Sequence, residues 1–303
     1  MFKKIFLLFK SLSFILKHDL NKKNKIKALI KYLNWHLLNI INNKPIIFNW
    51  INDSVFIARK SDTSATGNIY VGLLEYIDML FVLHALKKDD VFIDVGANQG
   101  MYTIISSKVI GAKTYAFEPV ENTYSKLQQN ISINNIDKLV TSKKIGISNS
   151  AGKLLISNNL DAMNQIIIDK SDINKEEIIT STLDNEINEN EDIILKIDVE
   201  GFEMHVLKGA TKLFSSNNLI ALIIEINNSC LKFGNTKEEI HNEIIKYGFY
   251  PVEYNPFSRS LSKTNSIEHK KNNTIYIRDF KKIKERILCA KKSTIHTSWG
   301  IEV

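Results

Sequence analysis

The chain has 303 residues, of which 44% are hydrophobic and 24% are charged, with 12 glycines and 4 prolines. This composition excludes collagen-like, low-complexity and largely disordered proteins. The two cysteines, Cys230 and Cys289, are too few and too far apart for a disulfide scaffold or a Cys-x-x-Cys zinc site. We therefore expect a globular protein of a reducing compartment, the cytoplasm.

The charge balance is basic but rests almost entirely on lysine. Forty basic residues against 33 acidic ones give +7, and only four of the basic residues are arginine. Proteins that read nucleic-acid sequence depend on arginine for bidentate contacts. The lysines also gather near the two ends of the chain. We expect no nucleic-acid partner, and the oligomeric state stays open.

The first 20 residues are predicted to form a helix. Lys3, Lys10 and Lys17 lie seven residues apart in a largely apolar segment. Because Lys10 interrupts that run, the segment is neither a signal peptide nor a membrane span. Such a helix can lie on an anionic membrane surface, at the inner face of the membrane, or pack on its own domain. Both alternatives stay open.

A second helix is predicted from about Lys25 to Ile41. Two short strands, PIIFNW and SVFIARK, follow it, with Asn52 and Asp53 as the turn. The predicted core positions of the helix are Leu29, Leu33, Trp35 and Leu37.

From Asp89 onward, apolar strands alternate with amphipathic helices. Such alternation predicts a mostly parallel, doubly wound α/β sheet. The strands are VFIDVG, KTYAFEP, LVTSKKIGIS, DIILKIDVE and LIALIIEIN, with helices at 101–109, 123–134, 202–214 and 237–247.

The pattern changes at the end of the sheet and in the middle of the chain. FYPVEY and NTIYIRD are joined by a polar loop, so the last two strands should pair antiparallel at one sheet edge. A parallel sheet closed by a reversed strand is characteristic of Rossmann-like methyltransferases. Residues 150–191 are less regular, with KLLIS and QIIID as extra strands, and form either an insertion or a cover over the site.

The first strand ends in a glycine-containing turn. Ligands of doubly wound sheets bind beyond the carboxyl ends of the strands. The turn lacks the G-x-G-x-x-G fingerprint of dinucleotide sites. Asp94 would repel a pyrophosphate but favours S-adenosylmethionine, which carries an ammonium and a sulfonium. The turn consists of Asp94, Val95, Gly96, Ala97, Asn98, Gln99 and Gly100.

Glu118 follows the second strand, 24 residues after Asp94. This is close to the roughly 20-residue spacing at which an acidic side chain meets ribose hydroxyls. Glu118 therefore indicates a nucleoside cofactor, and Asp94 favours S-adenosylmethionine over NAD.

Three more carboxylates follow the later strands. Asp198 and Glu200 come after one strand, and Glu225 ends the next. Methyl transfer to a hydroxyl needs close approach and removal of the hydroxyl proton. Asp198 or Glu200 is the candidate base, with Glu225 as its orienting partner and His205 as a third candidate. Coordination of one Mg²⁺ is the second interpretation; no resident metal is predicted.

Four blocks in order resemble the FkbM family of S-adenosylmethionine-dependent methyltransferases, over roughly Asp62 to Asp279. They are DVFIDVGANQGMYTI, YAFEPVENTYSKLQQNI, ILKIDVEGFEMHVLKGA and LIIEIN. The resemblance implies that Asp94, Gly96, Asn98, Gly100 and Glu118 hold the cofactor and that Asp198, Glu200 and Glu225 line the reacting end. An upstream block, TGNIYVGLLEYIDMLFVLHAL, resembles one branch of the family and would bring Tyr70, Glu75 and His84 near the cofactor turn.

The resemblance also implies an activity and a domain plan. Family members resemble O-methyltransferases of sugar or polyketide hydroxyls, so a small molecule or a surface glycan is the expected acceptor. An N-methyltransferase of amino sugars or peptides and a non-catalytic membrane-associated protein are the alternatives. We expect an N-terminal extension at 1–60, the methyltransferase domain at 61–280 and a basic tail at 281–303.

Overall fold

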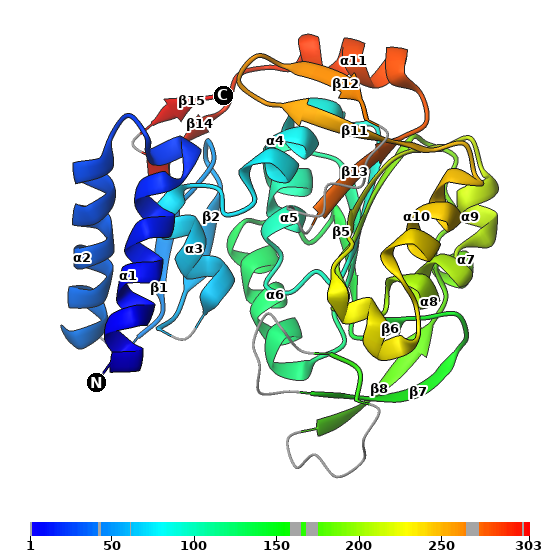
Figure 1. Ribbon diagram of the computed structural model, residues 1–303, viewed down its shortest axis with the longest axis horizontal. Helices are drawn as coiled ribbons and strands as arrows, with labels where there is room; N and C mark the ends of the chain where they lie inside the picture. The colour runs from blue at the N-terminus through cyan, green and yellow to red at the C-terminus, as the bar shows by residue number, and fades with distance from the viewer. Residues whose placement is uncertain are drawn as a thin grey trace. The chain divides into compact units, whose positions relative to one another are not determined.

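The computed structural model describes residues 2–41, 44–60, 62–157, 165–167, 175–264, 273–298 and 300–303. The chain forms two compact units, Met1–Tyr76 together with Lys292–Val303, and Ile77–Lys291 (Figure 1). The domain boundaries expected from the sequence stay a prediction. Residues 281–303, expected as a basic tail, include most of helix α11 and the strands β14 and β15.

The first unit joins the two ends of the chain. Strands β1 and β2 form the predicted antiparallel hairpin, in which Asn52 adopts a left-handed conformation at the turn. Ile51 bridges Ile295 near the C-terminus, and the buried Trp50 donates a hydrogen bond to the Gly72 carbonyl at 2.7 Å. The elements are α1 (Phe2–Lys17), α2 (Lys25–Ile41), β1 (Ile46–Asn49), β2 (Val55–Ala58), α3 (Thr63–Val71), β14 (Thr294–Ile295) and β15 (Ile301–Glu302).

Helix α2 has the predicted bounds but buries a different face. Ala28, Trp35 and Asn39 are its buried residues. Leu33 and Leu37, predicted as core, are 63% and 55% exposed, so those two predictions were wrong. The helix is apolar on more than one face, and sequence periodicity does not select which face the rest of the unit covers.

The second unit contains the predicted α/β sheet, in the order β12-β11-β13-β10-β9-β3-β4-β5. Its core, β10-β9-β3-β4-β5, is parallel, and β13 runs antiparallel to β10. The central strands are buried on both faces, as their continuous apolar runs require. The eight strands of the sheet are β3 (Val91–Val95), β4 (Lys113–Phe117), β5 (Val140–Lys143), β9 (Ile193–Ile197), β10 (Leu219–Glu225), β11 (Tyr250–Asn255), β12 (Ser260–Lys263) and β13 (Asn273–Ile277).

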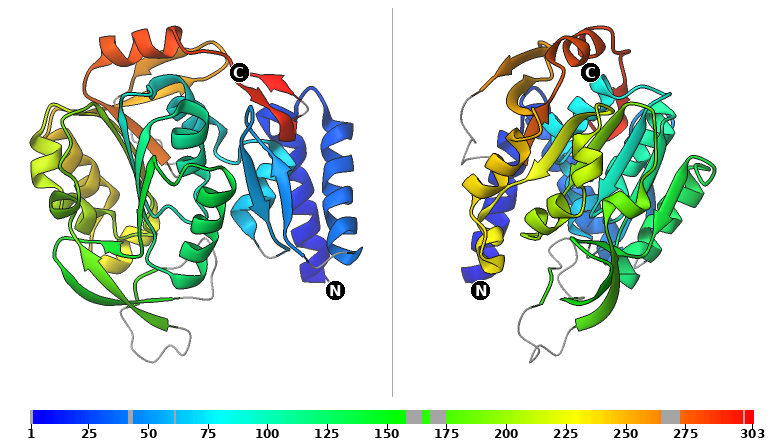
Figure 2. Two further views of the ribbon diagram at one scale, coloured as in Figure 1. Left: turned by 180° about the vertical axis from the view of Figure 1, so that it is seen from behind. Right: turned by 90° about the vertical axis from the view of Figure 1, so that its right-hand side faces the viewer.

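Helices cover both faces of this sheet, α4 to α6 on one and α8 to α10 on the other (Figures 1 and 2). The single helix predicted at 202–214 is two short helices. At the break, a Cβ on Gly209 would lie 2.0 Å from the Ser148 carbonyl oxygen, so this position requires glycine. The helices are α4 (Tyr76–Ala85), α5 (Met101–Thr103), which continues as a π-helix (Ile104–Ile110), α6 (Glu121–Ile133), α8 (Glu203–Lys208), α9 (Thr211–Ser215) and α10 (Lys237–Ile245).

Two sequence expectations need correction. The loop predicted between the last two strands contains β12, which pairs with β11 and forms the sheet edge. The segment 150–191 contributes two strands, β7 and the unpredicted β8, to a three-stranded sheet in the order β6-β8-β7, whose strand β6 precedes the segment. In QIIID, residues 165–167 are described and Ile166 bridges Ile156; the last two lie outside the described residues. The elements are β6 (Gly146–Ile147), β7 (Gly152–Ser157), β8 (Lys175–Ser181) and α7 (Leu183–Glu186).

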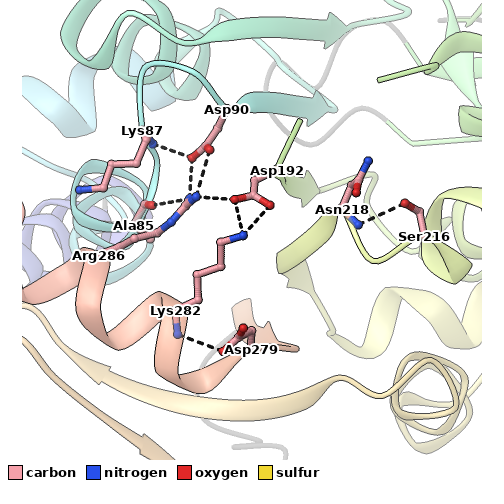
Figure 3. Close-up of polar contacts among 9 residues, drawn as sticks. All are labelled: Ala85, Lys87, Asp90, Asp192, Ser216, Asn218, Asp279, Lys282 and Arg286. Atoms are coloured by element: carbon pink, nitrogen blue, oxygen red, sulfur yellow. Dashed lines mark hydrogen bonds and ion pairs between the residues drawn. The ribbon is translucent and has the colours of Figure 1, made fainter. Parts of the chain in front are cut away.

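Helix α11 (Phe280–Leu288) is fastened to the amino ends of the central strands (Figure 3). Arg286 binds Asp90, which precedes β3, through two hydrogen bonds of 2.6 and 3.1 Å. It also binds Asp192, which precedes β9, at 2.5 Å, and Lys282 pairs with the same Asp192. This network lies at the sheet edge opposite the strands' carboxyl ends.

In the described parts of the chain, no single helix is long and apolar enough to cross a membrane. One bent pair, Thr63–Val71 with Tyr76–Ala85, meets that test jointly by length and composition.

Candidate functional site

The sheet register aligns the carboxyl ends of β3, β4 and β9. Asp94 on β3 is paired with Ala116 on β4 and with Lys196 on β9. The residues that follow these strands therefore meet at one edge, as expected for parallel neighbours. This is the edge at which the sequence placed the candidate residues.

The turn after β3 depends on its glycines. Gly96 has φ +80°, and a Cβ there would lie 1.9 Å from the Asp198 carbonyl oxygen. Gly100 has φ +85°, and a Cβ there would lie 2.5 Å from Leu127. The turn therefore packs directly on the end of β9, which only a residue without a side chain permits.

Glu118 organises this turn from the end of β4. Its Oε2 accepts a hydrogen bond from the Asn98 N–H and its Oε1 accepts one from the Val120 N–H, both at 3.0 Å. Burial raises the pKa of Glu118 to about 7, although the two hydrogen bonds act in the opposite direction and lower it. Each carboxylate oxygen has a second lone pair, so Glu118 can still accept a hydroxyl donor such as a ribose.

Asp94 is 1% exposed and belongs to the same region. The Thr103 hydroxyl donates to its Oδ2 at 2.8 Å. Burial raises the pKa of Asp94 to about 6, while the positive charge of Lys196 lowers it. A buried carboxylate of this kind favours a cationic ligand over an anionic one.

Lys196 is a member of the site that the sequence reading missed. It is buried within β9, its Nζ lies 2.7 Å from Asp198 Oδ2, and it lies 4.8 Å from the centre of the Tyr102 ring. The signal was present, because a lysine inside the apolar strand IILKI needs a partner. Asp198 is therefore held in an ion pair.

The structure brings the three candidate catalytic carboxylates together. One carboxylate oxygen from each of Asp198, Glu200 and Glu225 lies within 4.8 Å of the others. Burial, and then the charge of Asp198, raise the pKa of Glu200 to about 7 and that of Glu225 to about 8. Among the described residues, Glu225 Oε2 is buried with no hydrogen-bond partner.

This cluster can do two kinds of chemistry. A carboxyl group with a pKa near neutrality can accept a proton from a substrate hydroxyl. Three carboxylates at this spacing could instead hold a hard divalent cation such as Mg²⁺.

The backbone between Asp198 and helix α8 is held in an uncommon conformation. Glu200 has φ +53°, and Gly201, at φ +105°, packs so tightly that a Cβ would lie 2.6 Å from the Ser229 carbonyl. Glu203 is buried and accepts the Gly201 N–H at 3.0 Å. A non-glycine residue at positive φ is uncommon and costs conformational energy, so the surrounding contacts must hold Glu200 in this conformation.

His205 lies in an aromatic stack. Its ring is parallel to Phe202 at 3.9 Å between centroids, and Phe233 packs edge-on against both rings. Burial lowers the pKa of His205, and Lys208 lowers it further. This environment favours a packing role over that of a base.

The upstream block contributes Asp78 rather than His84 to this edge. Asp78 Oδ2 accepts a hydrogen bond of 3.0 Å from Asn273, which pairs with Glu225 across β10 and β13. His84 shares a hydrogen bond of 2.5 Å with Tyr254. Ala85, its neighbour, is bonded by Arg286 at the amino ends of the strands. The expectation that His84 lies near the cofactor turn was therefore wrong. Tyr70 and Glu75 belong to the other unit.

The inserted sheet lies beside the site at two points. Glu176 of β8 accepts the Glu121 N–H at 3.0 Å, close to Glu118. Lys232 lies in the 3-10 helix Asn228–Phe233, which follows β10, and donates a hydrogen bond of 2.5 Å to Gln165. These contacts favour the interpretation of residues 150–191 as a cover.

A family model and two relatives of known description match this chain. A model described as the methyltransferase FkbM domain matches residues 94–251, just over half of the chain. A hexuronic acid methyltransferase, AglP, of Haloferax volcanii is 31% identical over 150 residues, 48% of this chain and 59% of that protein. A methyltransferase, sdnD, of Sordaria araneosa is 25% identical over 169 residues, 44% of this chain and 65% of that protein. The alignments thus span less than two thirds of either relative.

A solved structure of a methyltransferase FkbM from Methylobacillus flagellatus is 16% identical with a TM-score of 0.43. The match covers 63% of this chain and 44% of that one.

Proposed function

Because the chain belongs to the FkbM family of S-adenosylmethionine-dependent methyltransferases, we propose that it methylates a sugar hydroxyl of a surface glycan or its precursor. The observation that carries this proposal is the cluster of Asp198, Glu200 and Glu225, with carboxylate oxygens within 4.8 Å of one another. The cluster would supply a base at the carboxyl edge of the sheet, where the turn after β3 also lies.

The residues of the turn fit S-adenosylmethionine. The buried carboxylate of Asp94 suits a cationic ligand, and Glu118 has acceptor capacity left for ribose hydroxyls. Backbone N–H groups of the turn and of the helix start can receive a ligand carboxylate. When bound, this cofactor supplies an electrophilic methyl group.

Glu225 is the proposed general base. Asp198 is committed to Lys196, whereas Glu225 Oε2 has no partner among the described residues. When the acceptor oxygen takes the methyl group, the bond between that carbon and the sulfonium sulfur would break, S-adenosylhomocysteine would be released, and the Glu225 carboxylate would accept the hydroxyl proton. Glu200 and Asp198 then orient the acceptor. Burial, and then the charges of these two residues, keep the pKa of Glu225 high.

A sugar acceptor has support from one relative. The Haloferax volcanii protein, which shares 31% identity, is described as a hexuronic acid methyltransferase. A hydroxyl of such a sugar is a weak nucleophile at neutral pH, so a base is needed.

Isothermal titration with S-adenosylhomocysteine tests the cofactor assignment. We expect saturable binding to the wild type, at least about tenfold weaker binding to Asp94→Ala and Glu118→Ala, and unchanged binding to Glu253→Ala, an exposed acid on β11. Equal binding by all four proteins would contradict the assignment of Asp94 and Glu118 to the cofactor site.

The acceptor is tested with glycans extracted from cells that lack this protein. Purified enzyme and S-adenosylmethionine labelled in the methyl group should label that fraction, and fragmentation should place the methyl on oxygen. A methyl found on nitrogen would replace the hydroxyl acceptor with an amine. No labelling of any glycan fraction would contradict the glycan proposal.

A further inference from the structure

Helix α2 has two apolar faces, and the first unit covers only one of them. On the inner face, Ala28 packs with Ile15 of α1 and Val71 of α3. Trp35 is 3% exposed and packs against Phe48 of β1 at 5.6 Å between ring centroids. These contacts account for the helix as part of the fold.

The outer face is a continuous apolar stripe. Its members lie within a narrow sector of the helix and are between 44% and 78% exposed. A helix that needed only its inner contacts would carry polar residues here. The stripe consists of Ile26, Ile30, Leu33, Leu37, Ile40 and Ile41.

Positive charge is concentrated in this part of the chain and gathers at one end of the stripe. Residues 1–41 contain nine lysines and no arginine, and their single acid is Asp19, a net of +8. The whole chain carries +7, so the remaining residues are close to neutral. Lys22, Lys23, Lys25 and Lys27 gather at the beginning of α2 and are exposed.

The positive charge of residues 1–41 decides between two possible partners of the stripe, a second copy of the chain and a lipid surface. Its four-three spacing would also suit a second α2 helix. Two copies meeting there would bring together two segments that each carry a net charge of +8, with Asp19 already counted. An anionic lipid surface reverses the sign of that interaction and accepts apolar side chains below its head groups.

We infer that the outer face of α2 binds the surface of an anionic phospholipid bilayer, with the stripe inserted among the head groups and the lysines contacting them. This assigns the contact to α2, whereas the sequence alone suggested residues 1–20. The Leu33 and Leu37 side chains, exposed in the structure, form the centre of the surface.

Vesicle co-sedimentation of the full chain tests this inference. We expect binding to vesicles of phosphatidylcholine with phosphatidylglycerol, little binding to phosphatidylcholine alone, and weaker binding as salt is added. Leu33→Ser/Leu37→Ser should weaken binding at least about tenfold. Lys23→Gln/Lys25→Gln should weaken it by about fivefold per lysine.

Matched variants separate the stripe from general surface properties. Ile245→Ser/Leu288→Ser removes exposed apolar side chains from α10 and α11, and Lys281→Gln/Lys284→Gln removes exposed lysines from α11. Both should bind vesicles like the wild type. Thermal unfolding and S-adenosylhomocysteine affinity, unchanged in every variant, show that the fold is intact.

Two results would overturn the inference. One is wild-type binding of anionic vesicles by Leu33→Ser/Leu37→Ser. The other is a stable dimer of the wild type, seen by light scattering, that the same exchange dissociates, since this would assign the stripe to a second copy.

Discussion

Lys196 Nζ lies 2.7 Å from Asp198 Oδ2, although the lysine is buried inside the sheet and the aspartate projects from its edge. The same lysine lowers the pKa of Asp94, its neighbour on β3. One buried cation thus interacts with Asp94 of the cofactor turn and with Asp198 of the carboxylate cluster.

Replacing Lys196 should destabilise the protein. Lys196→Met leaves Asp94 and Asp198 without their cation, so the pKa of Asp94 rises further above its ordinary value. We expect a loss of about 1–3 kcal/mol in the free energy of unfolding, since one partner of the pair is partly exposed. Urea unfolding measures it, with Lys208→Met, an exposed lysine on α8, as the unaffected control. Equal stability of both variants would contradict the role of the ion pair.

Removing the proposed base should stop turnover and spare the cofactor. Glu225→Gln keeps the size of the side chain but cannot accept a proton, so we expect a rate about 10²–10⁴ times lower. S-adenosylhomocysteine affinity should stay near that of the wild type. Glu200→Gln and Asp198→Asn should also lose turnover, and Glu253→Gln should not. Loss of the wild-type rate on chelation, with recovery in Mg²⁺, would reassign the carboxylates to a metal.

The rate should rise with pH across neutrality. Burial and neighbouring carboxylates raise the pKa of Glu225 to about 8, and the base acts only after losing its proton. The three carboxylates titrate together, so the apparent pKa belongs to the cluster. Initial rates between about pH 6 and 9 should therefore increase and then level off. Rates that fall over this range would rule out a carboxylate base.

Stability should show the opposite trend. The folded pKa values of Asp94, Glu118, Glu200 and Glu225 are raised to between about 6 and 8, so the folded state holds protons that the unfolded state releases. Their contribution is present below the ordinary carboxyl pKa and is lost as pH rises through the folded values. We expect the free energy of unfolding to fall by on the order of 1 kcal/mol or more between pH 5 and about 8.

Urea titrations at several pH values measure this trend. Glu118→Gln and Glu225→Gln should each flatten it, because an amide has no proton to lose. A stability that rises over the same range would contradict the raised pKa values.

The Arg286 network should hold α11 to the sheet. Arg286→Met leaves Asp90 buried without its partner, and breaking such a pair costs about 3–5 kcal/mol. Lys284→Met, on the exposed side of the same helix, should change stability by less than about 0.5 kcal/mol. Urea unfolding of the two variants compares them, and similar losses would show that Arg286 is dispensable.

The sequence by itself determined the sheet and the positions of the candidate residues. Continuous apolar runs identified the buried strands, and Gly96, Gly100, Asp94 and Glu118 marked the ends of two of them. These signals are local, because a strand end and a tight turn depend on neighbouring residues. Since parallel strands end at the same edge, the proximity of Asp198, Glu200 and Glu225 followed from them and was confirmed.

Only the tertiary structure decided which groups contact one another across the chain. Lys196 forms an ion pair with Asp198, and Arg286 forms one with Asp90. Asp78 accepts a hydrogen bond from Asn273. In α2, periodicity marked more apolar positions than one face can bury, and contacts with α1 and α3 selected the side containing Ala28. Burial and pairing are set by residues distant in sequence, so local pattern leaves open both the partner of a charge and the face of a helix.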